Sequence, residues 1–319
     1  MPALDMPLEK LQTYMGTNPC PEDMDDFWDQ GLAEMYAADP KPVFTPFDLG
    51  SACCDAFDLT FTAVDGAKIH ARLLKPKHIA DQVPAVIEFH GLGGFSQDWA
   101  EMLIYASQGF VSVSMDARGQ GGSSEDPGGY AGTTFGEPFI RGLDGTPERM
   151  YTRNLFLDTA MLVRIVMELS YVDASRVGVF GNSQGGGLAL ACASLMPKIK
   201  LCAAQNPYMC DYQRVWEMDL CPNAYNALRL YMRIFDPRHQ RPEEIFTKLG
   251  YVDVQHLTKR IRAKVLMATG LMDTTCPPSS QFAAYNKIVS EKEMMLYPNF
   301  GHEEFFGHKT IVYQFLCGL

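Results

Sequence analysis

The stretch Arg176-Val-Gly-Val-Phe-Gly181-Asn182-Ser183-Gln184-Gly185-Gly186 decides the fold of this chain. It places the pattern Gly-x-Ser-x-Gly after a short apolar run and before a helical pattern. That setting is typical of a nucleophile elbow, a tight strand-to-helix turn that exposes a serine hydroxyl above a sheet. Gly181 and Gly185 fit such a turn because side chains there would collide with the adjacent strand and helix. The helix beyond Ser183 also points its positive end toward developing negative charge.

Outward from this turn, short apolar runs alternate with helical patterns. We expect strands at residues 85–89, 110–115, 177–180, 201–204 and 265–268, and helices at 99–107, 155–169 and 186–195. Upstream, the spacing predicts a helix over 21–38 and a β-hairpin over 57–73, closed by Asp65-Gly66. Buried strands that alternate with helices indicate the α/β class. Together with the elbow they predict an α/β-hydrolase fold, a doubly wound and mostly parallel sheet.

The chain contains no repeat, low-complexity segment or linker, so we expect one domain over residues 1–319. Residues 1–83 form its N-terminal helix and hairpin extension. Between about 206 and 262 the alternation breaks, and this stretch is rich in Tyr, Met, Trp and Arg. An insertion at this place forms a cap over an active site or decorates the surface, and the sequence leaves both interpretations open.

Composition and charge argue against several kinds of partner and cofactor. The 319 residues are 47% hydrophobic and 20% charged, and the formal net charge of −11 disfavours nucleic acid and anionic membranes as partners. No secretory signal and no membrane-spanning apolar segment is visible, so we expect a cytoplasmic protein. The chain has nine cysteines and no CxxC or HExxH pattern. We therefore expect no metal and reduced cysteines packed as small hydrophobic residues, among them Cys192, Cys202 and Cys317.

A serine nucleophile needs a base, and the base needs an orienting acid. In this fold the chain order is serine, acid, histidine. Asp273 follows the strand at 265–268 in a turn, and Pro277-Pro278 separates it from the next helix, which disfavours a role as helix cap. His302 follows the next strand in a Gly-His loop, a setting that the other histidines lack. Ser183, Asp273 and His302 are therefore the predicted catalytic triad.

The negative charge of a tetrahedral intermediate needs two N–H donors. One is expected from Gln184, the residue after the serine. The other is expected from the loop His90-Gly91-Leu92-Gly93-Gly94, with Leu92 as first choice and Gly91 as second. An ordinary tight turn is the alternative interpretation of these glycines.

Three motifs in this order, Arg118-Gly119-Gln120, Gly181-Asn182-Ser183-Gln184-Gly185 and His302-Glu303, resemble the signatures of carbohydrate esterase family 7. This is the acetyl xylan esterase and cephalosporin-C deacetylase group. Residues 206–212 and 273–282 also resemble its typical stretches. The likeness covers nearly the whole chain.

This resemblance implies a serine carboxylesterase that removes acetyl groups from small acetylated substrates, such as acetylated xylo-oligosaccharides and cephalosporin C. It implies the triad Ser183, Asp273 and His302, the oxyanion donors Leu92 and Gln184, no cofactor, a cytoplasmic location and a hexameric ring. It also implies that six motif residues support the site without taking part in the reaction: Arg118, Gly119, Gln120, Gly181, Gly185 and Glu303.

One residue departs from the family pattern. The family's loop reads His-Gly-Tyr, whereas here Leu92 stands in the third position, so an aromatic ring beside the ester is missing. Two other functions remain as alternatives. One is a different acyl hydrolase on the same scaffold, such as a peptidase, a thioesterase or a longer-chain esterase. The other is a non-catalytic binding protein, which the intact triad disfavours.

Overall fold

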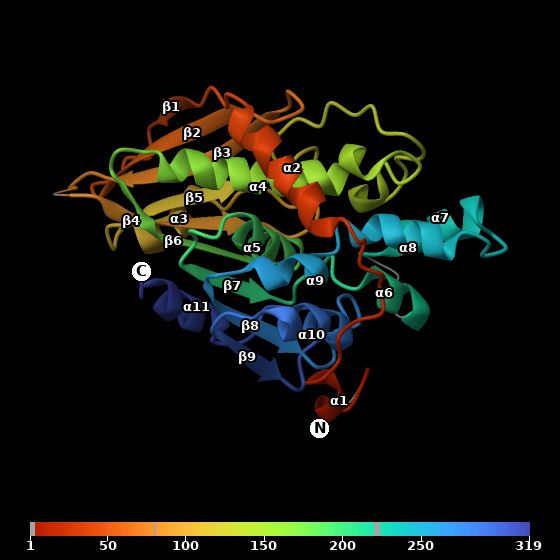
Figure 1. The fold of residues 1–319 in the computed structure, drawn as a ribbon. Coiled ribbons are helices and arrows are strands. Elements are labelled where there is room, and N and C mark those ends of the chain that lie inside the picture. Colours follow the sequence, from red (N-terminus) through yellow and green to blue (C-terminus); the bar gives the residue numbers. More distant parts are fainter. Residues whose placement is uncertain (1–3, 80, 220–223) are drawn as a thin grey trace.

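The computed structural model describes residues 4–79, 81–219 and 224–319. Its strands form a nine-stranded sheet in the order β1-β2-β3-β5-β4-β6-β7-β8-β9 (Figure 1). The strands are β1 (Val43–Phe47), β2 (Cys54–Thr62), β3 (Lys68–Pro76), β4 (Val83–Phe89), β5 (Val111–Met115), β6 (Val172–Asn182), β7 (Leu201–Gln205), β8 (Lys264–Gly270) and β9 (Lys292–Tyr297). The α-helices are α1 (Leu8–Leu11), α2 (Met24–Ala37), α3 (Trp99–Ala106), α4 (Tyr151–Met167), α5 (Gln184–Leu195), α6 (Tyr212–Met218), α7 (Asn226–Phe235), α8 (Pro242–Gly250), α9 (Val254–Leu257), α10 (Pro278–Lys287) and α11 (His308–Leu316).

Strand direction divides the sheet into two parts. From β5 through β4, β6, β7 and β8 to β9, neighbouring strands are parallel. The predicted hairpin is present as β2 and β3, which with β1 add an antiparallel edge next to β5. The parallel strands are joined by helices, because a parallel connection needs a crossover. The expectation of a mostly parallel α/β sheet is confirmed.

Alternation along the central strands distributes side chains between the two faces of the sheet. In β4, Ile87 and Phe89 belong to the main core, which also contains the apolar side chains of α4 and α5. Val86, which precedes Ile87 in β4 and points to the other face, packs with Tyr105 of α3 and Leu316 of α11. Helices therefore cover both faces, and α2 lies across α4 on the outside of one of them (Figure 1).

Several elements differ from the sequence-based expectation. Helix α4 begins at Tyr151, four residues before the predicted start. The prediction missed this first turn because its polar residues Thr152 and Arg153 are buried and do not follow the apolar pattern. Strand β1 was not predicted, since it contains Pro46; an edge strand tolerates proline because one side of its backbone needs no partner. Cys192 and Cys202 are buried as expected, whereas Cys317 is exposed.

The insertion expected at about 206–262 contains α6, α7, α8 and α9. Residues 220–223 of this stretch lie outside the described residues. Helices α6, α7 and α8 gather at one end of the molecule (Figure 1). Helix α9 instead packs against α5, and its four residues are buried. The last part of the predicted insertion thus belongs to the helical layer on the sheet. Within the described ranges, no helix combines the length and the apolar character needed to cross a bilayer.

Candidate active site

The candidate site lies where the parallel strands end. Ser183 follows β6, Asp273 lies three residues after β8, and His302 lies in the loop after β9. Loop residues 90–94 follow β4, and residues 116–120 follow β5. Because the carboxyl ends of parallel strands meet at one edge of a sheet, five loops from distant parts of the sequence converge there.

Ser183 occupies the turn between β6 and α5 with φ 58° and ψ −119°, a conformation that residues other than glycine rarely adopt. The turn is held by the Ser183 N–H, which donates to the carbonyl oxygen of Gln205 on β7 (2.9 Å). A Cβ atom on Gly181 would clash with the Gly185 backbone, and one on Gly185 would clash with the Phe89 carbonyl oxygen. The two glycines are therefore required by close packing of β6, α5 and β4.

His302 lies between Ser183 and Asp273. Its Nε2 is 2.9 Å from Ser183 Oγ, and its Nδ1 is 2.8 Å from Asp273 Oδ2. Only a protonated Nδ1 can donate to the carboxylate, which leaves the Nε2 lone pair to accept the serine proton. This arrangement can remove a proton from Ser183 and stabilise the resulting imidazolium.

Asp273 is completely buried, and its carboxylate is fixed by further donors. Oδ1 accepts from the backbone N–H groups of Thr275 and Cys276, each at 2.8 Å. Oδ2 accepts from Gln281 Nε2 at 3.3 Å in addition to His302. The N-cap of α10 is Pro277, so Asp273 contacts the histidine and is not the cap of that helix.

Backbone N–H groups suited to an oxyanion lie on both sides of Ser183. Gln184 is the first residue of α5, where no preceding helical carbonyl is available to its N–H. Across the site, a Cβ atom placed on Gly91 would lie 3.8 Å from Ser183 Cβ. Neither Gly91 N–H nor Leu92 N–H donates to an acceptor in the described part of the chain. Both remain available as the second donor, and the half-buried Leu92 side chain packs against the main core.

Gln120 connects the two loops that supply these donors. Its Oε1 accepts from Gly93 N–H at 2.8 Å, and its Nε2 donates to Gln184 Oε1 at 2.8 Å. The same amide donates to Tyr151 Oη at 3.0 Å, and the Tyr151 hydroxyl donates to the Arg118 carbonyl oxygen at 2.7 Å. One side chain thus fixes the loop after β4 relative to the start of α5.

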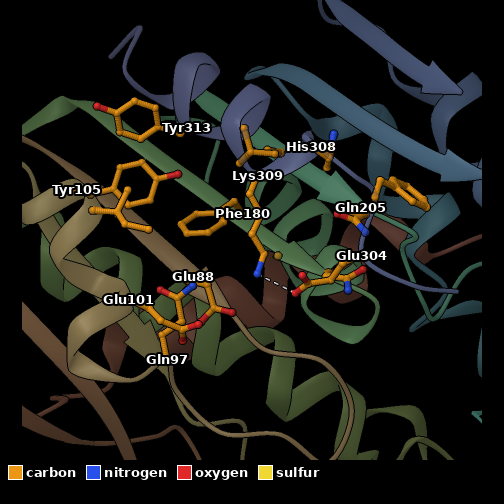
Figure 2. Close-up of a pocket in the computed structure, with 16 residues that line it drawn as sticks. Glu88, Gln97, Glu101, Tyr105, Phe180, Gln205, Glu304, His308, Lys309 and Tyr313 are labelled. Atoms are coloured by element: carbon orange, nitrogen blue, oxygen red, sulfur yellow. Dashed lines mark ion pairs between the residues drawn. The ribbon is translucent and has the colours of Figure 1, made fainter. Parts of the chain in front are cut away.

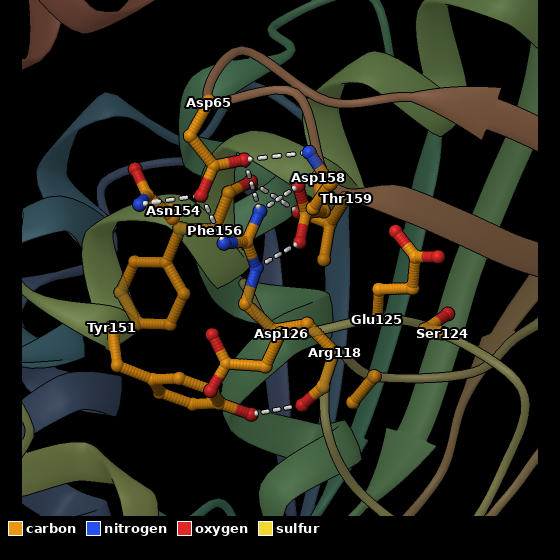
Figure 3. Close-up of polar contacts among 12 residues, drawn as sticks. Asp65, Arg118, Ser124, Glu125, Asp126, Tyr151, Asn154, Phe156, Asp158 and Thr159 are labelled. Carbon is orange, nitrogen blue, oxygen red and sulfur yellow. Dashed lines mark hydrogen bonds and ion pairs between the residues drawn. The ribbon is translucent and has the colours of Figure 1, made fainter. Parts of the chain in front are cut away.

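Arg118 anchors the segment that carries Gln120 (Figure 3). The guanidinium is fully buried and donates to both oxygens of Asp158 on α4, at 2.7 and 2.8 Å. It also donates to Asp65 in the β2–β3 turn, at 2.6 and 3.2 Å. Burial alone would lower the pKa of Arg118, but the charges of Asp158 and Asp65 outweigh it and raise that pKa. Gly119 follows with φ 59°, packed against Asp126, where a side chain would not fit.

Glu303 is exposed and directly follows His302 in the loop after β9. Its carboxylate Oε1 accepts from Gly301 N–H at 3.0 Å, closing a turn around His302. Its carbonyl oxygen accepts from Gln205 Nε2 at 2.9 Å. Glu303 therefore ties the His302 loop to the end of β7.

Comparison with known proteins places this geometry in a family. The sequence profile described as acetyl xylan esterase (AXE1) matches residues 1–319. The chain belongs to the acetyl xylan esterase family. This result confirms the family predicted from the three motifs.

Solved structures of this family share the whole fold. Acetyl xylan esterase 1 from Thermoanaerobacterium sp. JW/SL YS485 is 50% identical, with a TM-score of 0.97 and 99% of each chain covered. The acetyl xylan esterase from Paenibacillus sp. R4 is 32% identical, with a TM-score of 0.94, over 98% of this chain and 99% of that one. These likenesses confirm the α/β-hydrolase fold.

A longer relative is acetyl esterase Axe7A from Xylanibacter ruminicola. It is 27% identical over 287 residues, which make up 87% of this chain and 62% of that protein. The chain thus spans about three fifths of the length of this relative.

Three residues of the esterase-family site were not singled out from the sequence. His90 Nε2 accepts from Ala117 N–H at 2.9 Å, so its Nδ1 carries the proton and donates to the Gly91 carbonyl oxygen at 2.7 Å. Burial lowers the pKa of His90, in keeping with this neutral form. Gln205 and Gln281 act on Ser183 and Asp273 from other elements. Of the three, His90 alone had a local signal, its place directly before Gly91.

Proposed function

We propose that this chain is a serine carboxylesterase that removes acetyl groups from small acetylated sugars through an acyl-enzyme intermediate. The class of carboxylic ester hydrolase follows from family membership. The observation that carries the mechanism is the continuous series Ser183 Oγ, His302 and Asp273, with spacings of 2.9 and 2.8 Å. No cofactor enters this mechanism.

In the first half-reaction, His302 Nε2 takes the proton from Ser183 Oγ as this oxygen attacks the carbonyl carbon of the acetyl ester. Asp273 stabilises the imidazolium, and the N–H groups of Gln184 and Leu92 stabilise the oxyanion. The intermediate expels the sugar alcohol, which receives the proton from His302. Water, deprotonated by His302, then attacks the acetyl-serine, the bond to Ser183 Oγ breaks, and His302 returns the proton to this oxygen as acetate leaves.

The proposed substrates are acetylated xylo-oligosaccharides, with cephalosporin C as a further acetyl ester. The relatives named as acetyl xylan esterases support the first choice. Leu92 removes the ring that the family pattern places beside the ester, so the sugar selectivity of this chain is expected to differ from that of relatives with tyrosine.

The test combines two measurements on the purified chain. Rates on acetate, butyrate and octanoate esters of one alcohol should fall steeply beyond the shortest acyl groups, as in an acetyl esterase with a small acyl pocket. A serine-directed phosphonate should add one mass increment, located at Ser183 by peptide mass spectrometry. Octanoate hydrolysed as fast as acetate would point to a longer-chain esterase, and labelling at another serine would exclude the mechanism.

We also propose that residues 1–319 form one domain, that the protein is cytoplasmic and that it assembles as a hexamer. The first rests on the sheet, which runs from β1 near the N-terminus to β9 near the C-terminus. The proposed cytoplasmic location rests on the resemblance to carbohydrate esterase family 7, whose members are typically cytoplasmic. The hexamer rests on the resemblance to carbohydrate esterase family 7.

A further inference from the structure

A cavity of about 330 Å³ lies on the opposite side of the sheet from α5, between α3 and α11 (Figure 2). Its floor is formed by side chains from β4, β6 and β7, including Glu88, Phe180 and Gln205. Ser183 and His302 are not among its lining residues, although Gly181 and Asn182 are. The cavity is therefore a neighbour of the candidate active site and separate from it. Its volume is in the range of small-molecule sites in proteins.

Glu88 presents to this cavity a carboxyl oxygen that has no hydrogen-bond partner among the described residues. The side chain comes from the middle of the sheet and is only 8% exposed. Oε2 accepts a hydrogen bond from the Ser114 hydroxyl, whereas Oε1 has no partner in the part of the chain that the structure describes. Glu88 Oε1 is not among the fully enclosed unpaired atoms, so it is open to the cavity, where a bound molecule or water supplies the missing hydrogen bond. Figure 2 places Glu101 of α3 beside Glu88 on the same wall.

Part of the cavity wall is aromatic. The Tyr105 ring lies 5.5 Å from the Phe180 ring and 5.8 Å from the Tyr313 ring, measured between centroids. These rings come from α3, β6 and α11, so the wall is held by three separate elements. Aromatic faces attract cations and also accept apolar groups.

The positive groups that line the cavity are already paired or neutral. Lys309 Nζ forms an ion pair with Glu304 Oε1 at 2.8 Å (Figure 2). His308 Nδ1 lies 3.2 Å from the Tyr297 hydroxyl, and burial lowers the pKa of His308 to about 4. Within the described ranges, neither Glu88 nor Glu101 forms an ion pair with a lining residue.

We propose that this cavity is a second small-molecule site and that it binds an organic ammonium ion with an aromatic or apolar body. The ammonium group would donate to Glu88 Oε1 and neutralise the Glu88–Glu101 pair. The body would pack on Tyr105, Phe180 and Tyr313. A neutral ligand would leave Glu88 protonated and gain no ion pair, and an anion would be repelled by Glu101.

Binding of such a cation is coupled to a proton. Burial raises the pKa of Glu88 to about 8; the Ser114 hydrogen bond opposes this rise, while Glu101 and Asp116 add to it. The empty carboxyl is therefore mostly protonated at pH 7, whereas the ammonium ion favours the carboxylate. Binding at pH 7 is expected to release up to about one proton per site.

Isothermal titration calorimetry of the intact chain with benzylammonium chloride tests the proposal, with no ester present. Benzyl alcohol and benzoate serve as neutral and anionic probes of similar size. We expect benzylammonium to bind at least about tenfold more tightly than either, the usual effect of one hydrogen bond to a charged group. Titration in buffers of different protonation enthalpy should reveal the released proton.

Three variants locate the binding. Glu88→Gln keeps the shape of the protonated side chain and should weaken benzylammonium binding by about tenfold or more. Val312→Phe should abolish benzylammonium binding, because the larger side chain fills the cavity and leaves both carboxyl groups in place. If Glu88→Gln misfolds, Val312→Phe alone tests whether the cavity is the binding site. Glu291→Gln is the matched control, since Glu291 pairs with Lys264 away from the cavity. Equal binding of the three probes, or binding unchanged by Glu88→Gln and Val312→Phe, would overturn the proposal.

Discussion

The hydroxyl of Ser183 depends on one hydrogen bond to become reactive, the 2.9 Å contact with His302 Nε2. Ser183→Ala removes the attacking oxygen and leaves the backbone contact with Gln205 in place. We expect kcat for an aryl acetate to fall by about 10⁴-fold or more. Circular dichroism and the thermal midpoint should stay close to those of the parent chain. Activity above a few per cent in a clean preparation would show that another residue is the nucleophile.

Leu92 tests whether the second oxyanion donor is a backbone group. Leu92→Ala keeps the N–H and should leave kcat for a small aryl acetate nearly unchanged. Leu92→Pro deletes the N–H and should lower kcat by about 10²–10³-fold. Steady-state kinetics on both variants, with circular dichroism as a check on folding, makes the comparison.

Two outcomes of this comparison would change the assignment. Equal damage by the two Leu92 substitutions would mean that the side chain is essential. A fully active Leu92→Pro would move the donor to Gly91, whose N–H is also unpaired among the described residues.

At the scale of elements, Gln120 couples the loop after β4 to the start of α5 through Gly93 and Gln184. Gln120→Leu preserves the size of the side chain but removes these hydrogen bonds. We expect kcat to fall by about tenfold, corresponding to one or two net hydrogen bonds, while KM changes little. Gln82→Leu is the matched control, because Gln82 bonds the Ser170 carbonyl oxygen at the surface. A loss in KM alone would assign Gln120 to substrate binding instead of positioning.

Arg118 holds together α4, the β2–β3 turn and the segment after β5. Arg118→Leu leaves the fully buried Asp158 without its cation, and should destabilise the chain by about 3–5 kcal/mol. The double variant Arg118→Leu/Asp158→Asn removes both charges and should recover part of this loss. Urea unfolding of the single and double variants measures both effects. If the double variant is no more stable than Arg118→Leu, the buried charge is not the cause.

Helices and strands could be predicted where neighbouring residues in the sequence are enough to define the turn or the buried face. The Gly-x-Ser-x-Gly turn, the Asp-Gly hairpin and the apolar strands were all identified from neighbours in sequence. The start of α4 was missed because Arg153 is buried through a contact with Glu34, more than a hundred residues away. Pro46 concealed β1, because the sequence does not tell which strand will be at the edge.

Some residues of the candidate site carry a signal in the local sequence, and others do not. Ser183, Asp273 and His302 follow recognisable strand ends, so their chain order predicted a triad, and the structure brings the three side chains within hydrogen-bonding distance. Gln281 and Gln205 carry no such signal, since an amide that fixes a catalytic group is identical in sequence to a surface amide. Only the packing of α10 and β7 reveals what they contact.

At the scale of the whole molecule, the surface carries large apolar side chains that a monomer would expose. Phe306 is 93% exposed and Phe135 is 70% exposed. Apolar surface of this kind is often covered where subunits meet. We expect light scattering to give a mass near six times 35.6 kDa. A monomer at micromolar concentration would contradict the proposed hexamer.

The backbone of Ser183 has a consequence for how this enzyme can be improved. At φ 58° and ψ −119°, the backbone of glycine has a lower conformational free energy than that of serine, by on the order of 1 kcal/mol. A laboratory selection for heat resistance alone would therefore favour Ser183→Gly, which removes the reactive hydroxyl. Engineering campaigns should screen for turnover and durability together, and a stabilised variant that has lost its serine would be a foreseeable false positive.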